Sequence, residues 1–345
     1  MSPLSASPPI EAPGRPVGRC TVTWTDPVRE RTLTVDVWYP ARETSSLTRY
    51  EPIPGIAFES ANAHDAAPVE PGAYPLIVLS HGRTGMRFAY ALLSEALAAR
   101  GAIVVAPDHA GDVMTDWLGG TFVDDRTNEV NRVGDSGFVI DVMLGTALTG
   151  RSGLDPAVLT SVDASRIAAI GHSYGAYTAL AAAAGVRGVA PDQRIGAVVG
   201  LQPYTRSMSD TALARVRTPT LLVLSEFDTT APVATDGERP WALIPAEPTW
   251  RLDLFATAHH ASSDMGLYLE LAGSIPDLPP MVAAYVTMMT PDMIAEHLRP
   301  WREGLQIQVR AIWAFLDITL SMNNELGVAE ADQVAVTPGV VLQRR

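Results

Sequence analysis

The chain has 345 residues, of which 47% are hydrophobic and 18% are charged, a balance typical of a globular protein and not of a disordered one. Its 38 acidic and 25 basic residues give a formal charge of −13 without a basic cluster, which argues against a nucleic-acid partner. The single cysteine, Cys20, excludes a disulfide within the chain and a thiolate metal site.

The first 16 residues, MSPLSASPPIEAPGRP, are rich in proline and serine and have neither a basic start nor an apolar core. This composition predicts a disordered leader rather than a secretory signal. No apolar stretch of the sequence is long enough to form a transmembrane helix. We therefore expect a cytoplasmic protein without a membrane span.

Strand-like segments recur along the chain, and we count eight of them. The first two, CTVTWT and TLTVDVWY, alternate apolar and polar residues, which is typical of half-exposed strands at a sheet edge. The other six are more continuously apolar, as strands buried on both faces are. They read PLIVLS, AIVVAP, RIAAIG, IGAVVGL, PTLLVLS and WRLDLF.

Helical patterns separate the later strands. They span residues 86–100, 129–149 and 174–184, and a last one covers 305–322. Strands that alternate with helices imply right-handed crossovers and a mostly parallel sheet. The sequence therefore predicts an α/β fold with a mostly parallel eight-stranded sheet and helices on both faces, in a single domain over residues 17–345.

Two segments do not fit this alternation. Residues 40–72 are rich in Ala, Pro, Glu and Ser and predict a long surface loop. Residues 265–303 are apolar, rich in Met and broken by prolines, which predicts two or three short helices inserted before the last helix. Two interpretations of the insertion stay open: extra core packing, or a lid or pocket wall whose flexible Met side chains adapt to a ligand.

The segment IAAIGHSYGAYTAL, residues 167–180, contains the pattern Gly-x-Ser-x-Gly around Ser173. An ordinary turn between a strand and a helix is one interpretation, because glycines mark sharp corners in many proteins. The other is a nucleophile elbow, in which a serine stands at a strained corner between a buried strand and a closely packed helix. A short apolar strand before the motif and an Ala-rich helix after it favour the elbow.

Polar residues follow the predicted strands at their carboxyl ends, where an open α/β sheet binds its ligands. The sequence SHGRTG follows one strand, Asp108 and His109 follow the next, and Ser173 follows the third. Asp228 comes after TLLVLSEF, and a His259-His260 pair comes after WRLDLFATA. The order Ser, Asp, His is the chain order of an α/β-hydrolase triad.

The chemistry assigns a role to each of these residues. A serine hydroxyl needs a base to take its proton during attack, and a carboxylate must orient the imidazole that serves as that base. We predict Ser173 as nucleophile, His259 as base with His260 as the alternative, and Asp228 as the carboxylate. Asp236 and Glu226 compete with Asp228 for that place, but Asp228 directly follows its strand.

A developing oxyanion needs two preorganised donors. We predict the backbone N–H of Tyr174, directly after the nucleophile, and that of Arg83 in the HGRTG turn. Further candidates for the substrate pocket are His81, His109, Tyr204, Tyr285 and Met288. Scaffolding is the alternative for both histidines: residues such as His81 and His172 beside a site more often support it than react, and His109 can form a structural hydrogen-bonded pair with Asp108. The charge-rich segment 124–135 predicts a helix entrance held by ion pairs such as Arg132 with Asp135.

The spacing of the histidines does not fit a metal site, and no nucleotide-binding glycine loop is present in the sequence, so we predict neither a metal nor a cofactor. With a Ser-His-Asp triad, the predicted activity is hydrolysis of small-molecule carboxylic esters through an acyl-enzyme. The same triad acting on amide, thioester or carbon–carbon bonds is an alternative, as is a non-catalytic binding protein on a hydrolase fold. The oligomeric state stays open.

The chain resembles the platelet-activating-factor acetylhydrolase and dienelactone-hydrolase-like branch of the α/β-hydrolases from about VDVWYPA to the last helix. The motifs that carry the likeness are PLIVLSHGRTG, ALAARGAIVVAPDHAGD, GHSYGAYTAL, TPTLLVLSEFD and AHHASSDM. The resemblance implies a triad of Ser173, Asp228 and His259, with oxyanion donors at Arg83 and Tyr174. In the family an aspartate lies five residues beyond the histidine, and Asp264 fits His259 in this way. The chain departs from true dienelactone hydrolases in having a serine where they have a cysteine.

Overall fold

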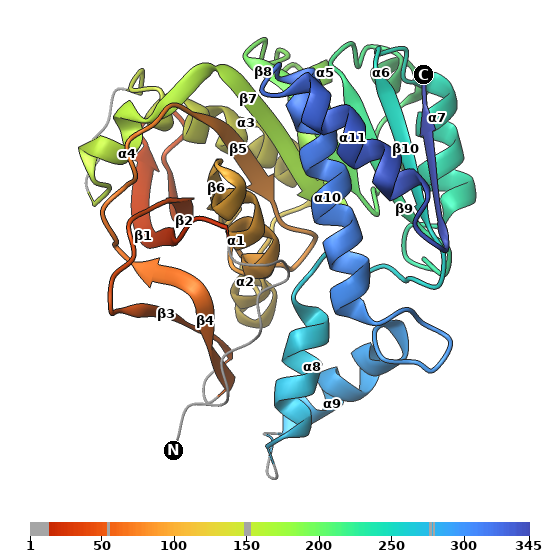
Figure 1. The fold of residues 1–345 in the computed structure, drawn as a ribbon, viewed down its shortest axis with the longest axis horizontal. Coiled ribbons are helices and arrows are strands. Elements are labelled where there is room, and N and C mark those ends of the chain that lie inside the picture. The colour runs from red at the N-terminus through yellow and green to blue at the C-terminus, as the bar shows by residue number, and fades with distance from the viewer. Residues whose placement is uncertain (1–13, 54–55, 148–152, 276–277, 279) are drawn as a thin grey trace.

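One twisted sheet runs through the described residues, which are 14–53, 56–147, 153–275, 278 and 280–345 of a computed structural model (Figure 1). The predicted leader lies outside them except for residues 14–16. The strands are β1 (Val17–Asp26), β2 (Arg31–Pro40), β3 (Leu47–Ile53), β4 (Ile56–Asp65), β5 (Tyr74–Ser80), β6 (Ile103–Pro107), β7 (Val162–His172), β8 (Ile195–Leu201), β9 (Thr220–Ser225), β10 (Thr249–Leu254) and β11 (Val340–Arg344).

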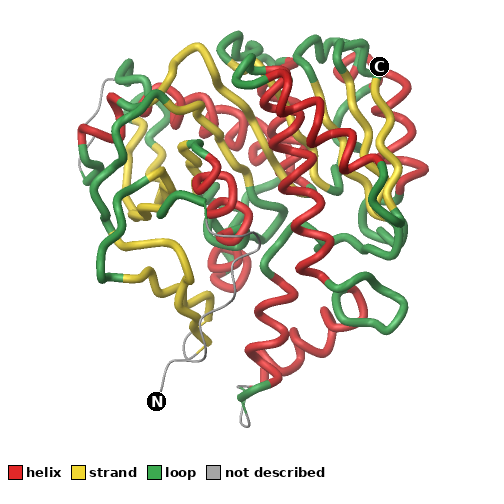
Figure 2. The backbone as a smooth tube through the Cα atoms, viewed as in Figure 1, coloured by secondary structure: helices red, strands yellow, loops and turns green. Residues whose placement is uncertain are grey.

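Helices flank the sheet on both faces, as the tube of Figure 2 shows in red. They are α1 (Ala91–Arg100), α2 (Met114–Gly119), α3 (Asp125–Met143), α4 (Pro156–Thr160), α5 (Tyr174–Ala184), α6 (Asp210–Leu213), α7 (Glu238–Leu243), α8 (Met265–Gly273), α9 (Pro280–Met289), α10 (Trp301–Thr319) and α11 (Asn324–Ala335). Helix α5 matches its predicted range, whereas α1 starts at Ala91 rather than at 86 because residues 87–90 form turns.

The strand order is β11-β10-β9-β8-β7-β5-β6-β2-β1-β4-β3. The run from β10 to β6 is parallel throughout. Antiparallel pairing joins β2 to β6 and to β1 on one side, and β11 to β10 on the other. The carboxyl ends of the central strands therefore meet at one edge of the sheet, and the predicted triad residues follow β7, β9 and β10 at that edge. The α/β class with a mostly parallel sheet is confirmed.

The predicted strand count is wrong, because the described sheet has eleven strands and not eight. All eight predicted strands are present. Two of the additional ones, β3 and β4, lie in residues 40–72, which we expected to form a loop. Their register shifts and polar residues hide the strand pattern, and a stacked pair of buried rings, Tyr50 and Phe58 at 4.9 Å, packs them on the core. The third, β11, is a short edge strand with little burial.

Alternation along the buried strands divides the core into two layers. In β5, Leu76 and Val78 pack with α3 and α5 on one face, while Ile77 and Leu79 pack with α1 and α10 on the other. Successive side chains of a strand point to opposite faces, so a continuously apolar strand fills both layers. This burial fixes the sheet that carries the site.

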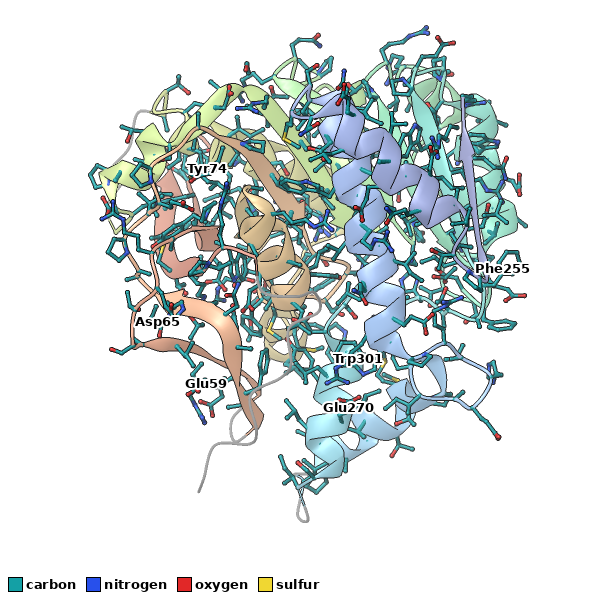
Figure 3. The ribbon with its side chains drawn as sticks, viewed as in Figure 1. Glu59, Asp65, Tyr74, Phe255, Glu270 and Trp301 are labelled. Atoms are coloured by element: carbon teal, nitrogen blue, oxygen red, sulfur yellow. The ribbon has the colours of Figure 1, made fainter. Side chains whose placement is uncertain are left out.

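The insertion 265–303 contains α8 and α9, as predicted, and both extend beyond the body at the lower edge of the view (Figure 1). Side chains at the junction of α8 with α10 hold it in place (Figure 3): the Trp301 indole donates a hydrogen bond to Glu270 at 2.8 Å. Tyr268 of α8 also packs on Phe58 of β4, with ring centroids 6.3 Å apart. Helix α9 leaves Met288 63% exposed.

Candidate active site

Ser173 stands at the corner between β7 and α5, with φ of 55° and ψ of −119°. Two glycines make the corner possible. A Cβ at Gly171 would lie 2.0 Å from the carbonyl oxygen of Gly175, and a Cβ at Gly175 would lie 2.0 Å from the carbonyl oxygen of Ser80. No side chain fits such gaps, so strand and helix approach this closely only with glycine on both sides of the serine. The backbone is that of a nucleophile elbow.

Ser173, His259 and Asp228 lie in one line of hydrogen bonds, here called the elbow array. The Nε2 atom of His259 is 2.9 Å from the Oγ atom of Ser173, and its Nδ1 atom is 2.8 Å from Oδ2 of Asp228. The other oxygen of Asp228 accepts hydrogen bonds from the backbone N–H groups of Thr230 and Ala231 at 3.0 and 2.7 Å. These bonds fix the carboxylate, which in turn fixes the imidazole.

The structure does not bring the alternative residues into this line. His260 packs edge-on against His259, with ring centroids 5.2 Å apart, and burial lowers the pKa of His260 to about 3. Asp236 accepts a hydrogen bond from the backbone N–H of Thr205 at 2.7 Å, and Glu226 is an exposed acceptor for Ala256 N–H.

Of the two predicted oxyanion donors, Tyr174 directly follows the serine, and Arg83 directly follows Gly82, where a Cβ would lie 3.4 Å from the Cβ of Ser173. Gly82 to Gly85 form a β-turn closed by a hydrogen bond of 3.0 Å, and Arg83 is its second residue, whose N–H the turn does not use. Tyr174 is the first residue of α5, where a helix has no internal acceptor. Within the described part of the chain, neither N–H donates a hydrogen bond. The Arg83 side chain forms an ion pair with Asp125 at 2.5 Å.

A buried arginine beside this turn forms an ion pair that differs from the predicted one. Arg132 does not pair with Asp135: it forms an ion pair of 2.7 Å with Asp112 and donates to Thr178 at 2.9 Å. It also donates to the carbonyl oxygen of His81, one residue before the turn. The fully buried guanidinium requires several acceptors, and they come from helix α5 and from the loops after β5 and β6.

Behind the turn lies a second line of the same residue types, Ser80, His109 and Asp135, here called the inner array. The Nε2 atom of His109 is 3.1 Å from the Oγ atom of Ser80, and its Nδ1 atom is 3.2 Å from Oδ2 of Asp135. Asp135 also pairs with Arg29 and Arg31, both at 2.8 Å. Burial lowers the pKa of His109 to about 4, and the nearby charge of Arg132 acts in the same direction.

The predicted pocket residues lie in different surroundings. His81 and His109 are buried beneath the turn, and the backbone N–H of His109 donates to the Nε2 atom of His81 at 3.1 Å. Tyr204 is close to the elbow, since its backbone N–H donates to the Ser173 carbonyl at 3.0 Å. The Tyr285 side chain lies outside what the structure describes, and Met288 is on the exposed side of α9.

Three further residues around the elbow, His172, Asp264 and Tyr90, were not assigned a catalytic role from the sequence. His172, inside the elbow motif, contacts both the Tyr90 hydroxyl and the His259 carbonyl. Asp264 accepts hydrogen bonds from the first N–H groups of α1, at Ala91 and Leu92, and burial raises the pKa of Asp264 to about 8. The five-residue spacing from His259 pointed to Asp264, whereas nothing in the sequence pointed to Tyr90.

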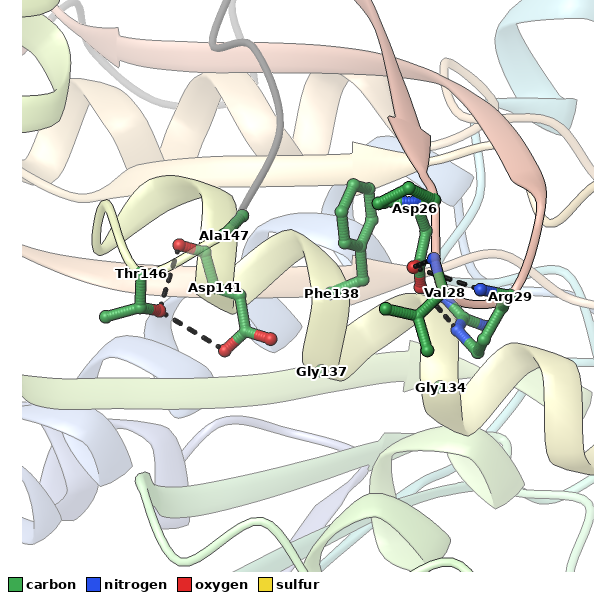
Figure 4. Close-up of a pocket in the computed structure, with 10 residues that line it drawn as sticks. Asp26, Val28, Arg29, Gly134, Gly137, Phe138, Asp141, Thr146 and Ala147 are labelled. Atoms are coloured by element: carbon green, nitrogen blue, oxygen red, sulfur yellow. Dashed lines mark hydrogen bonds and ion pairs between the residues drawn. The ribbon is translucent and has the colours of Figure 1, made fainter.

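A separate hollow of about 450 Å³ lies between the β1–β2 turn and α3 (Figure 4). Its lining includes Asp26, which forms an ion pair with Arg29 at 2.6 Å, and none of the predicted site residues. Over the ranges described, three or more His, Cys, Asp or Glu side chains nowhere gather as metal ligands would. No described helix combines the length and apolarity of a bilayer span.

Two family profiles match the chain. The profile described as Chlorophyllase matches residues 64–237, and the one described as Platelet-activating factor acetylhydrolase, isoform II, matches residues 155–335. Each covers about half of the 345 residues. The second match contains all three residues of the elbow array.

Curated relatives and a solved structure add to this. The cutinase est1 of Thermobifida alba is 30% identical over 181 residues, which are 52% of this chain and 51% of that protein. The cutinase est2 of the same organism is 30% identical over 209 residues, 58% of this chain and 59% of the relative. The chain thus spans little more than half the length of these relatives. A ferulic acid esterase from Streptomyces cinnamoneus shares the fold, with a TM-score of 0.65 and 20% identity over 92% of this chain and 93% of that one.

Proposed function

Because the chain belongs to the α/β-hydrolase branch of platelet-activating factor acetylhydrolase isoform II and chlorophyllase, we propose that it is a serine-dependent carboxylic ester hydrolase. The observation that carries the proposal is the elbow array, with His259 bridging Ser173 and Asp228 at hydrogen-bond distance. The names of the relatives, cutinase and ferulic acid esterase, support the same activity. The substrate we propose is a small-molecule ester.

In the first half of the reaction, the Nε2 atom of His259 takes the proton of Ser173 while the Oγ atom attacks the ester carbonyl carbon. The tetrahedral oxyanion then accepts hydrogen bonds from the backbone N–H groups of Arg83 and Tyr174. When this intermediate collapses, the imidazolium gives its proton to the departing alkoxide, and the acyl group stays on the serine. Water attacks the acyl-enzyme by the same steps and releases the acid.

Asp228 has a positioning and electrostatic role in this scheme. An ionised carboxylate only accepts hydrogen bonds, so its contact with the Nδ1 atom of His259 keeps the proton on that nitrogen and leaves Nε2 free to act as base. The carboxylate also stabilises the imidazolium formed during attack. The two backbone N–H groups on its other oxygen keep it in place for both tasks.

We further propose that segment 265–303 forms part of the pocket wall. It begins directly after the loop of His259, and the ring of His297 packs edge-on against Phe227, the neighbour of Asp228, at 5.2 Å. Phe227 is 41% exposed, so this contact lies at the outer side of the site. The cytoplasmic location stays a prediction from the sequence.

The test combines labelling with turnover. A fluorophosphonate probe should label Ser173 of the full chain, and p-nitrophenyl esters of rising acyl length should be hydrolysed by the wild type and not by Ser173→Ala. Labelling without hydrolysis of any ester would redirect the proposal to amide, thioester or carbon–carbon substrates. Absence of both labelling and hydrolysis would favour a binding protein.

A further inference from the structure

A continuous chain of hydrogen bonds connects the oxyanion turn with the loop of the predicted base. The backbone N–H of Gly82 donates to the Tyr90 hydroxyl at 3.2 Å, and this hydroxyl is 2.8 Å from the Nδ1 atom of His172. The Nε2 atom of His172 is in turn 2.7 Å from the carbonyl oxygen of His259. This chain of hydrogen bonds therefore passes through His172, the residue directly before the predicted nucleophile.

The direction of every bond in this chain follows from the chemistry of its two ends. The carbonyl of His259 can only accept, so the Nε2 atom of His172 carries a hydrogen. Burial holds the pKa of His172 well below its usual range, so the ring is neutral and its Nδ1 atom is an acceptor. The Tyr90 hydroxyl must then donate to Nδ1, and its oxygen accepts the N–H of Gly82.

The segment that carries Tyr90 is also tied to the His259 loop at a second point. Asp264 accepts hydrogen bonds from the N–H groups of Ala91 at 2.7 Å and Leu92 at 3.3 Å. Its own N–H donates to the carbonyl oxygen of Ala89 at 2.9 Å. Tyr90 thus lies between two residues that are bound to the loop, which leaves its hydroxyl little freedom to leave His172.

From these contacts we infer that Tyr90 and His172 are positioning residues that hold the oxyanion turn and the base loop in register around Ser173. The inference rests on the proposed ester hydrolysis. Arg83, the predicted donor, directly follows Gly82, so a shift of Gly82 moves the Arg83 N–H. A shift of the His259 carbonyl moves the imidazole, whose ring also packs on that of His172 at 4.8 Å. A displacement of about 1 Å at such groups can cost on the order of 100-fold in rate.

The first test removes one hydroxyl. Tyr90→Phe leaves the ring in place but deprives both Gly82 N–H and the Nδ1 atom of His172 of their partner. We expect kcat for p-nitrophenyl ester hydrolysis to fall about 10- to 100-fold, with KM within about threefold, because substrate contacts are unchanged. The matched control is Tyr39→Phe on strand β2. Tyr39 is as buried as Tyr90, and its hydroxyl donates a hydrogen bond to the Ala67 carbonyl at 2.9 Å. The control should lower Tm like Tyr90→Phe and leave kcat unchanged.

A second pair of variants breaks the chain of hydrogen bonds at His172, one bond in each variant. In His172→Asn the amide oxygen still accepts from Tyr90, but the side chain is too short to reach the His259 carbonyl. His172→Gln keeps a donor near that carbonyl and loses the acceptor for Tyr90. We expect kcat to fall in both, each variant having lost one of the two bonds. Nitrogen-15 NMR of the histidine rings in the wild type should show His172 as the neutral Nε2–H tautomer.

The outcomes separate this inference from the proposed function. If the wild type hydrolyses esters and labels at Ser173, but Tyr90→Phe or either His172 variant keeps kcat within twofold of wild type, the positioning role is refuted. An Nδ1–H tautomer of His172, or an equal loss of kcat in Tyr39→Phe, would refute it as well. A wild type that neither hydrolyses esters nor labels would refute the proposed function instead.

Discussion

The elbow array and the inner array contain the same three residue types in the same order of contacts. In both, a histidine directs its Nδ1 atom to an aspartate and its Nε2 atom to a serine, with distances of 2.8 and 2.9 Å in the elbow array and 3.2 and 3.1 Å in the inner array. The geometric difference is a few tenths of an ångström. The surroundings differ much more.

The serines differ in backbone and access. Ser173 stands at a corner with φ of 55° and is 8% exposed, whereas Ser80 is the last residue of strand β5 and 2% exposed. The aspartates differ in charge balance. Burial alone would raise the pKa of Asp135, but hydrogen bonds from His109 and Arg31 outweigh it and hold that pKa below its usual range. The order of hydrogen bonds alone therefore does not identify a nucleophile, because the backbone at the serine and the charges around the aspartate also distinguish the two arrays.

The largest contrast should appear between the two serines. Ser173→Ala should lower kcat on the order of 10⁶-fold, the effect seen when such a nucleophile is removed from other serine hydrolases. Ser80→Ala removes a buried hydrogen bond to His109 and should leave kcat within about tenfold of wild type. Hydrolysis of a p-nitrophenyl ester measures both. A Ser80→Ala variant as inactive as Ser173→Ala would make the two arrays functionally equivalent.

A similar loss is expected at the base. His259→Ala should reduce kcat nearly as far as Ser173→Ala, since the two residues act as a unit. Its neighbour His260 touches neither Ser173 nor Asp228, so His260→Ala should stay within about tenfold of wild type. The same ester assay applies. If His260→Ala were the inactive variant and His259→Ala active, the base would be assigned to the wrong histidine.

The aspartates should separate activity from stability. Asp228→Asn should lower kcat on the order of 10⁴-fold with a small change in the free energy of unfolding. Asp135→Asn should instead cost about 3 kcal/mol of stability, because it leaves Arg31 without its buried partner and Arg29 with Asp26 alone. Urea unfolding and kcat, measured on both variants, test the contrast. Equal stability losses would remove it.

The inner array should also contribute to the pH dependence of the free energy of unfolding. The pKa of His109 is about 4 in the folded protein, below the value near 6.5 of an unfolded chain, so protons bind more tightly to the unfolded state. Stability present above pH 6.5 is then lost as the pH falls towards 4. Between pH 7 and 4.5 this loss should amount to about 2–3 kcal/mol. His109→Gln should lose correspondingly less over that interval in urea unfolding, and an identical pH dependence would contradict the assignment.

The smallest effect concerns the proposed pocket wall beside the elbow array, which has no counterpart in our proposal for the inner array. If segment 265–303 forms a wall of the pocket, Met288→Ala should change the ranking of p-nitrophenyl esters by acyl length a few-fold, with Tm nearly unchanged because the side chain is 63% exposed. Leu326→Ala on α11 is the matched control, since Leu326 is 62% exposed. An unchanged ranking in Met288→Ala would leave the segment without a role in the pocket.

The central strands and the elbow could be predicted from the sequence because their signals are local. Continuous apolar runs mark the strands, and Gly171 and Gly175 mark a corner that tolerates no Cβ. The order of polar residues at strand ends then brought Ser173, Asp228 and His259 together in the prediction, and the structure places them within hydrogen-bond distance.

The remaining contacts depend on residues far apart in sequence. Strands β3 and β4 have no clear alternation, and their burial comes from pairing with β1 and from the Tyr50–Phe58 stack. The pairing of Arg132 with Asp112 instead of Asp135 follows from competition: Arg29 and Arg31, about 100 residues away in the chain, occupy Asp135. Short-range patterns carry no information about such competition.

The contact between Phe58 of β4 and Tyr268 of α8 joins two segments that lie far apart in the sequence. In addition, the Tyr268 hydroxyl donates a hydrogen bond to the Phe88 carbonyl at 3.2 Å, which fixes the same helix to the segment before α1. For protein engineering, the β3–β4 hairpin and the α8–α9 helices should therefore be treated as one packing unit made of two pieces. A chimaera that receives the helices without the hairpin would leave Tyr268 without its aromatic partner, so both pieces should be grafted together.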